Sequence, residues 1–196
     1  MLPWHQTQFR AVYSGLKQDS GRDLDKVIVT GANGVGKSHF AARLASARPN
    51  VPVVSFDAIK LTTGWEQRPR AEIDAALAIE IGKPVWILEG GPSLLFQAVE
   101  KADALIWLDP PEYVRVWQLV SRPWKFFGKT RPELPIGNID WPIQQYRFAL
   151  RSLKNRSKFR SYISEAFEST GDIQKWRCRS QRDRDAVFTQ WAKSSG

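Results

Sequence analysis

The sequence predicts a three-layer α/β fold in which a five-stranded parallel sheet is covered by helices on both faces. Two observations lead to this prediction. Short apolar runs alternate with stretches of helical periodicity, which is the pattern of parallel strands joined by crossover helices. A glycine-rich loop, Gly31 to Ser38, lies between the first apolar run and the first helical stretch. The length of 196 residues suits one domain with a single core.

The individual elements are predicted from runs of apolar residues and from their spacing. Strands are expected at 27–29, 51–56, 85–88, 104–108 and 173–178. Helices are expected at 39–47, 69–81, 94–101, 113–121, 142–154, 159–167 and 183–192. The apolar side of the 142–154 helix is predicted to consist of Ile143, Tyr146, Leu150 and Leu153.

Two segments depart from this alternation. Residues 1–24 are predicted to be an N-terminal extension that forms a short helix with Trp4, Phe9, Val12 and Leu16 on one face. Residues 122–142 contain several prolines and basic residues, and we predict a long, lid-like loop there. Loops of this length in compact domains are usually functional, so the segment is a candidate part of a ligand site.

Composition narrows the classes of function. The formal net charge is +9, and Pro111 to Arg160 holds eleven Lys or Arg residues against three acidic ones. Such a block can bind polyphosphate or nucleic acid, or serve solubility alone. The single cysteine, Cys178, cannot pair within the chain, so we expect a reducing, cytoplasmic setting. No apolar run approaches the ~20 residues that span a bilayer, and we therefore expect no membrane partner.

The glycine-rich loop fits G-x-x-x-x-G-K-[ST], the P-loop or Walker A motif. Its glycines allow backbone N–H groups to point inward at phosphate oxygens, where the following helix adds positive potential. Lys37 is predicted to reach the β- and γ-phosphates of ATP, and the Ser38 hydroxyl to bind Mg²⁺. The predicted nucleotide-binding residues are Gly31, Ala32, Asn33, Gly34, Val35, Gly36, Lys37 and Ser38.

Three acidic residues follow apolar strand candidates, at the sheet edge where ligands of such folds bind. Glu89 follows four apolar residues as a Walker B acid does, and is predicted to bind Mg²⁺ or to face the acceptor. Asp57 is predicted to orient or deprotonate an acceptor hydroxyl. Asp109 precedes two prolines, which favours a turn or helix cap over a catalytic role.

Phosphoryl transfer also needs positive charge at the transition state. Arg122 and Arg131 lie in the predicted lid-like segment and are the candidates for that role. Arg147 and Arg151 are spaced to form an anion site or a solvated helix face. Gly64-Trp65 is a candidate part of an acceptor pocket, although a single tryptophan more often serves packing.

Taken together, these motifs resemble the small bacterial P-loop proteins related to adenylate kinase that are often labelled DNA topology modulation proteins. The resemblance spans about 27–191. It depends on the P-loop and on Ser55-Phe56-Asp57 with Gly64-Trp65, Trp86 to Gly91, Leu105 to Pro111, and Gly128 to Glu133.

The resemblance implies a nucleoside-monophosphate-kinase-like sheet of order 2-3-1-4-5. It also implies that Asp57 and Glu89 face acceptor and metal, and that Arg122 to Arg131 belong to a lid. Where that group has Asp-Gly-Asn-Tyr, this chain has Glu89-Gly90-Gly91-Pro92.

The leading hypothesis is an ATP-dependent phosphotransferase that moves the γ-phosphoryl group of MgATP to a small acceptor, such as a nucleoside or nucleotide. Lys37, Asp57, Glu89, Arg122 and Arg131 are its predicted catalytic residues. The alternative is a nucleotide-binding regulator without turnover that contacts nucleic acid through the basic 111–160 segment. The acceptor, the preferred base and the oligomeric state are left open by the sequence.

Overall fold

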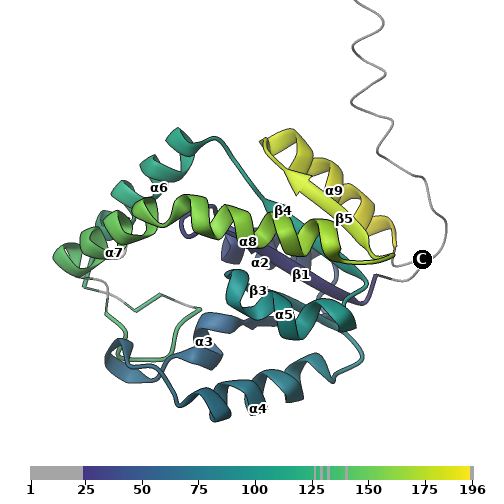
Figure 1. Cartoon of the computed structure of the whole chain (residues 1–196), viewed down its shortest axis with the longest axis horizontal. Coiled ribbons are helices and arrows are strands. Elements are labelled where there is room, and N and C mark those ends of the chain that lie inside the picture. The colour runs from purple at the N-terminus through teal and green to yellow at the C-terminus, as the bar shows by residue number, and fades with distance from the viewer. Residues whose placement is uncertain (1–23, 126, 129, 132, 140, 195–196) are drawn as a thin grey trace, which may run out of the picture.

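The computed structural model describes residues 24–125, 127–128, 130–131, 133–139 and 141–194. Its centre is a five-stranded parallel sheet in the order β2-β3-β1-β4-β5. The strands are β1 (Lys26–Gly31), β2 (Val53–Ser55), β3 (Trp86–Gly90), β4 (Ala104–Leu108) and β5 (Gln174–Cys178). Both the predicted fold class and the strand order are confirmed (Figure 1).

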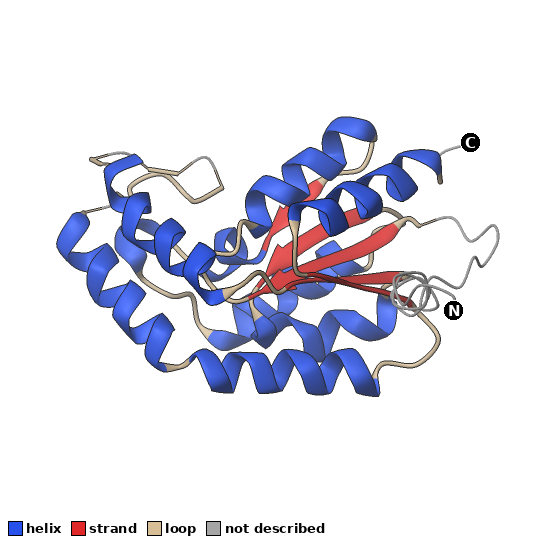
Figure 2. Cartoon of the chain, turned by 90° about the horizontal axis from the view of Figure 1, so that it is seen from above, coloured by secondary structure: helices blue, strands red, loops and turns tan. Residues whose placement is uncertain are grey.

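The sheet is buried on both faces, which explains why its strands are continuous apolar runs. In β1, Val27 and Val29 face one core cluster and Ile28 faces the other, and all three side chains are fully buried. The first cluster lies under α2 (Lys37–Ala47) and α9 (Gln181–Lys193). The second lies under α4 (Arg70–Ile81), α5 (Leu95–Ala98) and α8 (Arg156–Ser169), so helices cover both faces (Figure 2).

The remaining long helices, α6 (Glu112–Lys125) and α7 (Pro142–Lys154), pack against each other. They extend beyond the carboxyl end of the sheet, as Figure 2 shows at its left side. We call residues 112–154 the α6–α7 arm. The arm follows β4 directly, and this connection brings it to the sheet edge at which the P-loop lies.

Two predicted boundaries are wrong. The second strand ends at Ser55, and Phe56 and Asp57 begin a short helix, α3 (Phe56–Lys60), that the sequence did not predict. The chain turns there because Phe56 packs against Gly90, where an added Cβ would lie 2.7 Å from the Phe56 Cβ. The helix that begins at Glu112 continues to Lys125, so Arg122 lies on α6 and not in a loop.

The predicted apolar face of α7 is also wrong. The helix buries Gln145, Ala149 and Ser152, whereas Ile143 and Leu150 are 70% and 69% exposed. Polar partners from α6 decide this orientation, because the buried Arg115 donates to the Ser152 carbonyl and hydroxyl. The predicted N-terminal helix, residues 1–24, lies outside the described residues except for Leu24.

Candidate functional site

The glycine-rich loop has the conformation that its motif requires. Gly36 forms the N-cap of α2 with a φ of 84°, a value that side-chain-bearing residues rarely adopt. Gly34 has the same φ, and an added Cβ there would lie 2.7 Å from Leu119 of α6. Lys37 and Ser38 are the first two residues of α2. The backbone N–H groups of this turn therefore stand at a helix N-terminus, which favours an anion.

Lys37 lies close to three of the other predicted site residues. Its ammonium group donates to the Ala32 carbonyl at 3.1 Å, within the loop itself. Burial lowers the pKa of Lys37, and this effect outweighs the opposing influence of the Glu89 and Asp57 carboxylates; Arg122 lowers the pKa further. Glu89, Asp57 and Arg122 are thus each within electrostatic range of Lys37, although the four residues come from four separate elements.

Glu89 is the buried acid of the site, with an exposed fraction of 4%. It lies in β3, beside Val29 of β1, and its Oε1 accepts a hydrogen bond of 2.6 Å from the Ser55 hydroxyl. Burial raises the pKa of Glu89, while the Ser55 hydrogen bond and Lys37 lower it to a smaller extent. The Glu89 carboxylate and the Ser38 hydroxyl are oxygen donors of the hard kind that Mg²⁺ prefers, and with the phosphate oxygens of a bound nucleotide they would suit that ion.

No group of three or more His, Cys, Asp or Glu side chains that could hold a metal occurs in the described part of the chain. A Mg²⁺ ion at Glu89 would therefore take the rest of its ligands from phosphate and water, as Mg²⁺ commonly does in phosphoryl-transfer enzymes.

The two predicted arginines lie in different surroundings. Arg122 is half-buried on α6, on the side of the arm that reaches Lys37. Arg131 is 6% exposed; its guanidinium group pairs with Glu133 at 3.3 Å and lies 5.4 Å from the centre of the Trp65 ring. Glu133 in turn acts on the pKa of Glu89, so the Arg131–Glu133 pair is within range of the buried acid.

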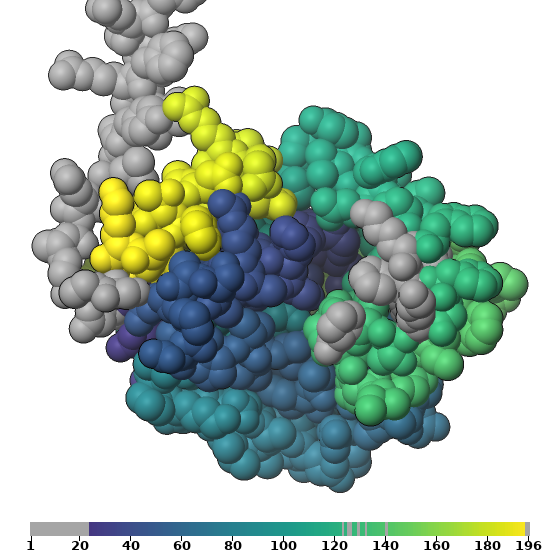
Figure 3. All heavy atoms as spheres, turned by 180° about the vertical axis from the view of Figure 1, so that it is seen from behind, coloured from purple at the N-terminus to yellow at the C-terminus, as the bar shows by residue number. Residues whose placement is uncertain are grey.

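The segment between α6 and α7 contacts the loop that follows α3. Asn138 is fully buried, and its amide group donates to the Thr62 and Pro135 carbonyls at 2.7 and 2.9 Å. Its carbonyl oxygen accepts from the Trp65 backbone N–H at 2.6 Å, and the Trp65 indole donates to the Ile139 carbonyl at 3.1 Å. Trp65 has a φ of 64°, the left-handed region that bulky residues avoid. The arm and this loop are thus in direct contact, and Figure 3 shows the early part of the described chain (purple to blue) between α9 (yellow) and the arm (teal to green).

Sequence reasoning missed three residues that shape the site. Ser55 orients Glu89, and the only sequence signal is its place in a strand next to the acid's strand. Arg184 of α9 donates to the Val35 carbonyl at 3.1 Å. Arg115 is 2% exposed and donates to the Asn33 carbonyl at 3.0 Å, which ties the P-loop to the arm. The residue pattern of α6 does not predict this contact. The apolar residues of the helix would be expected to face the core, but they lie on its outer face.

Asp109 forms ion pairs across the sheet edge, where the sequence favoured a turn or a helix cap. Its Oδ2 accepts from Arg177 at 2.6 Å and from Arg160 at 3.0 Å, which ties β5 and α8 to the end of β4. These ion pairs border a cavity of about 500 Å³ between the P-loop and α8. The predicted anion pair Arg147 and Arg151 lies exposed on the arm.

No family model and no curated protein sequence matches this chain. Among solved structures, a shikimate kinase from Acinetobacter baumannii in complex with shikimate aligns with a TM-score of 0.48 and 14% identity, over 85% of this chain and 90% of the other. A gluconokinase from Sinorhizobium meliloti aligns with a TM-score of 0.47 and 17% identity, over 88% and 96%. Similarities this weak carry no argument about activity, and the fold assignment is based on the sheet order and the P-loop.

Proposed function

We propose that this protein is an ATP-dependent phosphotransferase that moves the γ-phosphoryl group of ATP to a small, hydroxyl-bearing acceptor. The observation that supports it is the grouping of Lys37, Glu89, Asp57 and Arg122 around the mouth of the P-loop. A phosphate-binding loop alone suits many nucleotide-binding proteins. A buried acid, an exposed acid and an arginine beside it are the further parts that phosphoryl transfer uses.

On the donor side, the loop N–H groups from Gly31 to Ser38 bind the phosphates. Lys37 exchanges its contact with the Ala32 carbonyl for a phosphate oxygen, which restores a charged partner to a buried ammonium group. Ser38 and Glu89 hold Mg²⁺, which neutralises charge on the β- and γ-phosphates when it is bound. Arg122 stabilises the charge that develops on the transferred group, from the helix that also carries Arg115.

On the acceptor side, Asp57 is the candidate to orient and deprotonate the attacking hydroxyl. It is exposed on the first turn of α3, close enough to the site to act on the pKa values of Lys37 and Glu89. The Arg131 guanidinium group lies 5.4 Å from the centre of the Trp65 ring, and the two side chains are the candidates to supply a cation and an aromatic face to the acceptor. A planar or anionic acceptor, such as a nucleoside or nucleotide, suits this pair.

The test is a radiolabel transfer assay with [γ-³²P]ATP and Mg²⁺ across a panel of nucleosides, nucleotides, sugars and hydroxy acids. We expect transfer by the native chain, none by Lys37→Ala, and a loss of on the order of 100-fold for Asp57→Asn. Arg147→Ala, on the exposed face of the arm, is the matched control and retains activity. ATP binding by thermal shift with no transfer to any acceptor would instead support a nucleotide-binding protein without turnover.

A further inference from the structure

An exposed apolar stripe runs along the outer face of α6. Tyr113, Trp117 and Trp124 are 75%, 71% and 69% exposed, and Val120 between them is 44% exposed. The inner face of the same helix carries Leu119 and Arg115, each only 2% exposed. The stripe therefore points away from the core and from the nucleotide site. Contiguous apolar surface of this kind on a soluble domain usually marks an interaction site.

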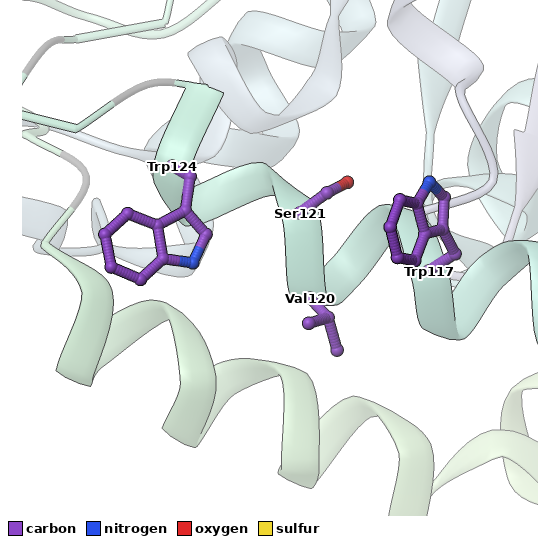
Figure 4. Close-up of a pocket in the computed structure, with 4 residues that line it drawn as sticks. All are labelled: Trp117, Val120, Ser121 and Trp124. Atoms are coloured by element: carbon purple, nitrogen blue, oxygen red, sulfur yellow. The ribbon is translucent and has the colours of Figure 1, made fainter.

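The spacing of the stripe is that of a helix-packing seam. Its residues follow one another at intervals of four, three and four, the a/d spacing of a coiled coil. A depression of about 400 Å³ on this face is lined by Trp117, Val120, Ser121 and Trp124, which Figure 4 shows along one side of α6. Positions i, i+3, i+4 and i+7 are the four that form a hole for a side chain of a facing helix. The surface is thus shaped for another helix.

The stripe is complementary to itself when it is turned around. Two antiparallel copies of α6, related by a two-fold axis between positions 118 and 119, place Trp117 opposite Val120 and Tyr113 opposite Trp124. The neighbouring positions 116 and 121 pair in the same register and hold uncharged Val and Ser. Positions 112 and 125, filled by Glu and Lys, pair at the two ends. This register also sets the partner's Trp117 over the hole.

We propose that the outer face of α6 is a homodimer interface in which two α6 helices pack antiparallel about a two-fold axis. A self-complementary patch is what a two-fold dimer requires. The four side chains of the stripe expose roughly 500 Å². The surface continues onto α7 through Tyr146, whose hydroxyl accepts from the Trp124 indole at 2.8 Å, and through Ile143 and Leu150 beside it. Together they approach the ~800 Å² per partner of a stable interface.

The dimer would brace the arm from outside, because the opposite face of α6 holds the P-loop through Arg115. This inference does not depend on the proposed activity, since it concerns a face directed away from the nucleotide site. It can be tested on the full chain without nucleotide.

The experiment is sedimentation velocity of the full chain over a wide range of protein concentration. We expect the native chain to form a dimer. Trp117→Glu should be a monomer, and its circular dichroism spectrum and melting curve should show that the monomer keeps its fold. Trp117→Ala weakens dimerisation by on the order of 30-fold or more, as a central aromatic residue does. Ile79→Glu, at a 67% exposed apolar position on α4, is the matched control and stays dimeric.

Cysteine cross-linking tests the register. A mixture of Trp117→Cys and Val120→Cys chains should form the mixed disulfide faster than either chain forms its own, while Trp117→Cys mixed with Ile79→Cys should not cross-link. A monomer at every concentration, or a dimer that Trp117→Glu leaves intact, overturns the proposal. A third outcome also overturns the proposal: the chain is a monomer that binds anionic vesicles or single-stranded nucleic acid, and Trp117→Glu abolishes that binding. The face would then be a site for that ligand.

Discussion

The sheet and the α6–α7 arm are stabilised in opposite ways. The central strands β1, β3 and β4 bury almost every side chain, and the residues that contact each other are apolar, with Glu89 as the main exception. The arm buries Arg115, Gln145 and Ser152 and exposes Trp117, Trp124, Ile143 and Leu150. Apolar burial is non-directional and fixes the sheet as a unit, whereas the arm depends on a few directional hydrogen bonds. An element held in the second way can be shifted by ligand contacts, which suits a segment that borders a phosphate site.

Removal of core volume should cause the largest change in the free energy of unfolding, and it should separate the sheet from the arm most clearly. Phe40→Ala deletes a 2% exposed ring between α2 and the sheet, and should lower the free energy of unfolding by about 3–5 kcal/mol. Ile136→Ala, which removes an 88% exposed side chain from the arm, should change it by no more than about 0.5 kcal/mol. Urea unfolding of both variants measures the difference. Equal losses would contradict the view that apolar burial is concentrated at the sheet.

The next largest effect is expected at the junction of the two regions. Arg115→Met removes donors to the Asn33 carbonyl, to Glu112 and to Ser152, and should cost about 2–4 kcal/mol. Because the P-loop loses its tie to the arm, affinity for ATP should fall as well, as isothermal titration would report. Arg115→Lys keeps the charge but not the forked set of donors. Compared with Arg115→Met, it should recover only part of the stability and part of the affinity for ATP.

A smaller, local effect is expected where the arm meets the loop after α3. Asn138→Ala leaves the Trp65 N–H and the Thr62 carbonyl without their buried partner, at a cost of about 1–3 kcal/mol. Hydrogen exchange of residues 61–67 should rise, while exchange in β1 and β4 should stay slow. Ile136→Ala, at an 88% exposed position of the same segment, serves as the control and should leave exchange unchanged.

The smallest expected effect is a gain in stability, where the preceding variants lose it. Burial raises the pKa of Glu89, so the folded chain takes up a proton that the unfolded chain releases, and stability falls as pH rises through that interval. Glu89→Gln carries no charge and should melt at a higher temperature than the native chain at pH 8. The difference should shrink as the pH falls below the ordinary glutamate pKa of 4.5. A lower melting temperature at pH 8 would contradict the stated cost of the buried carboxylate.

Much of the site could be predicted because its signals are local. The P-loop is contiguous, and the acid that follows an apolar run is recognisable from its neighbours, so the sequence alone singles out Lys37, Ser38 and Glu89 as candidates. The position of Asp57 was predicted on the wrong element, since the turn into α3 depends on how Phe56 packs against Gly90, far along the chain. The roles assigned to Asp57, Glu89, Arg122 and Arg131 stay predictions until the transfer assay is done.

No helix in the described part of the chain is long and apolar enough to cross a membrane. The sequence by itself determined the parallel sheet, its covering helices and the phosphate-binding loop, because hydrophobic periodicity and a glycine-rich turn are properties of neighbouring residues. Only the tertiary structure decided which face of an amphipathic helix is buried. On α6 and α7 the buried Arg115 and its polar partners face the protein while the apolar stripe faces outward, because these contacts join residues that are far apart in the sequence.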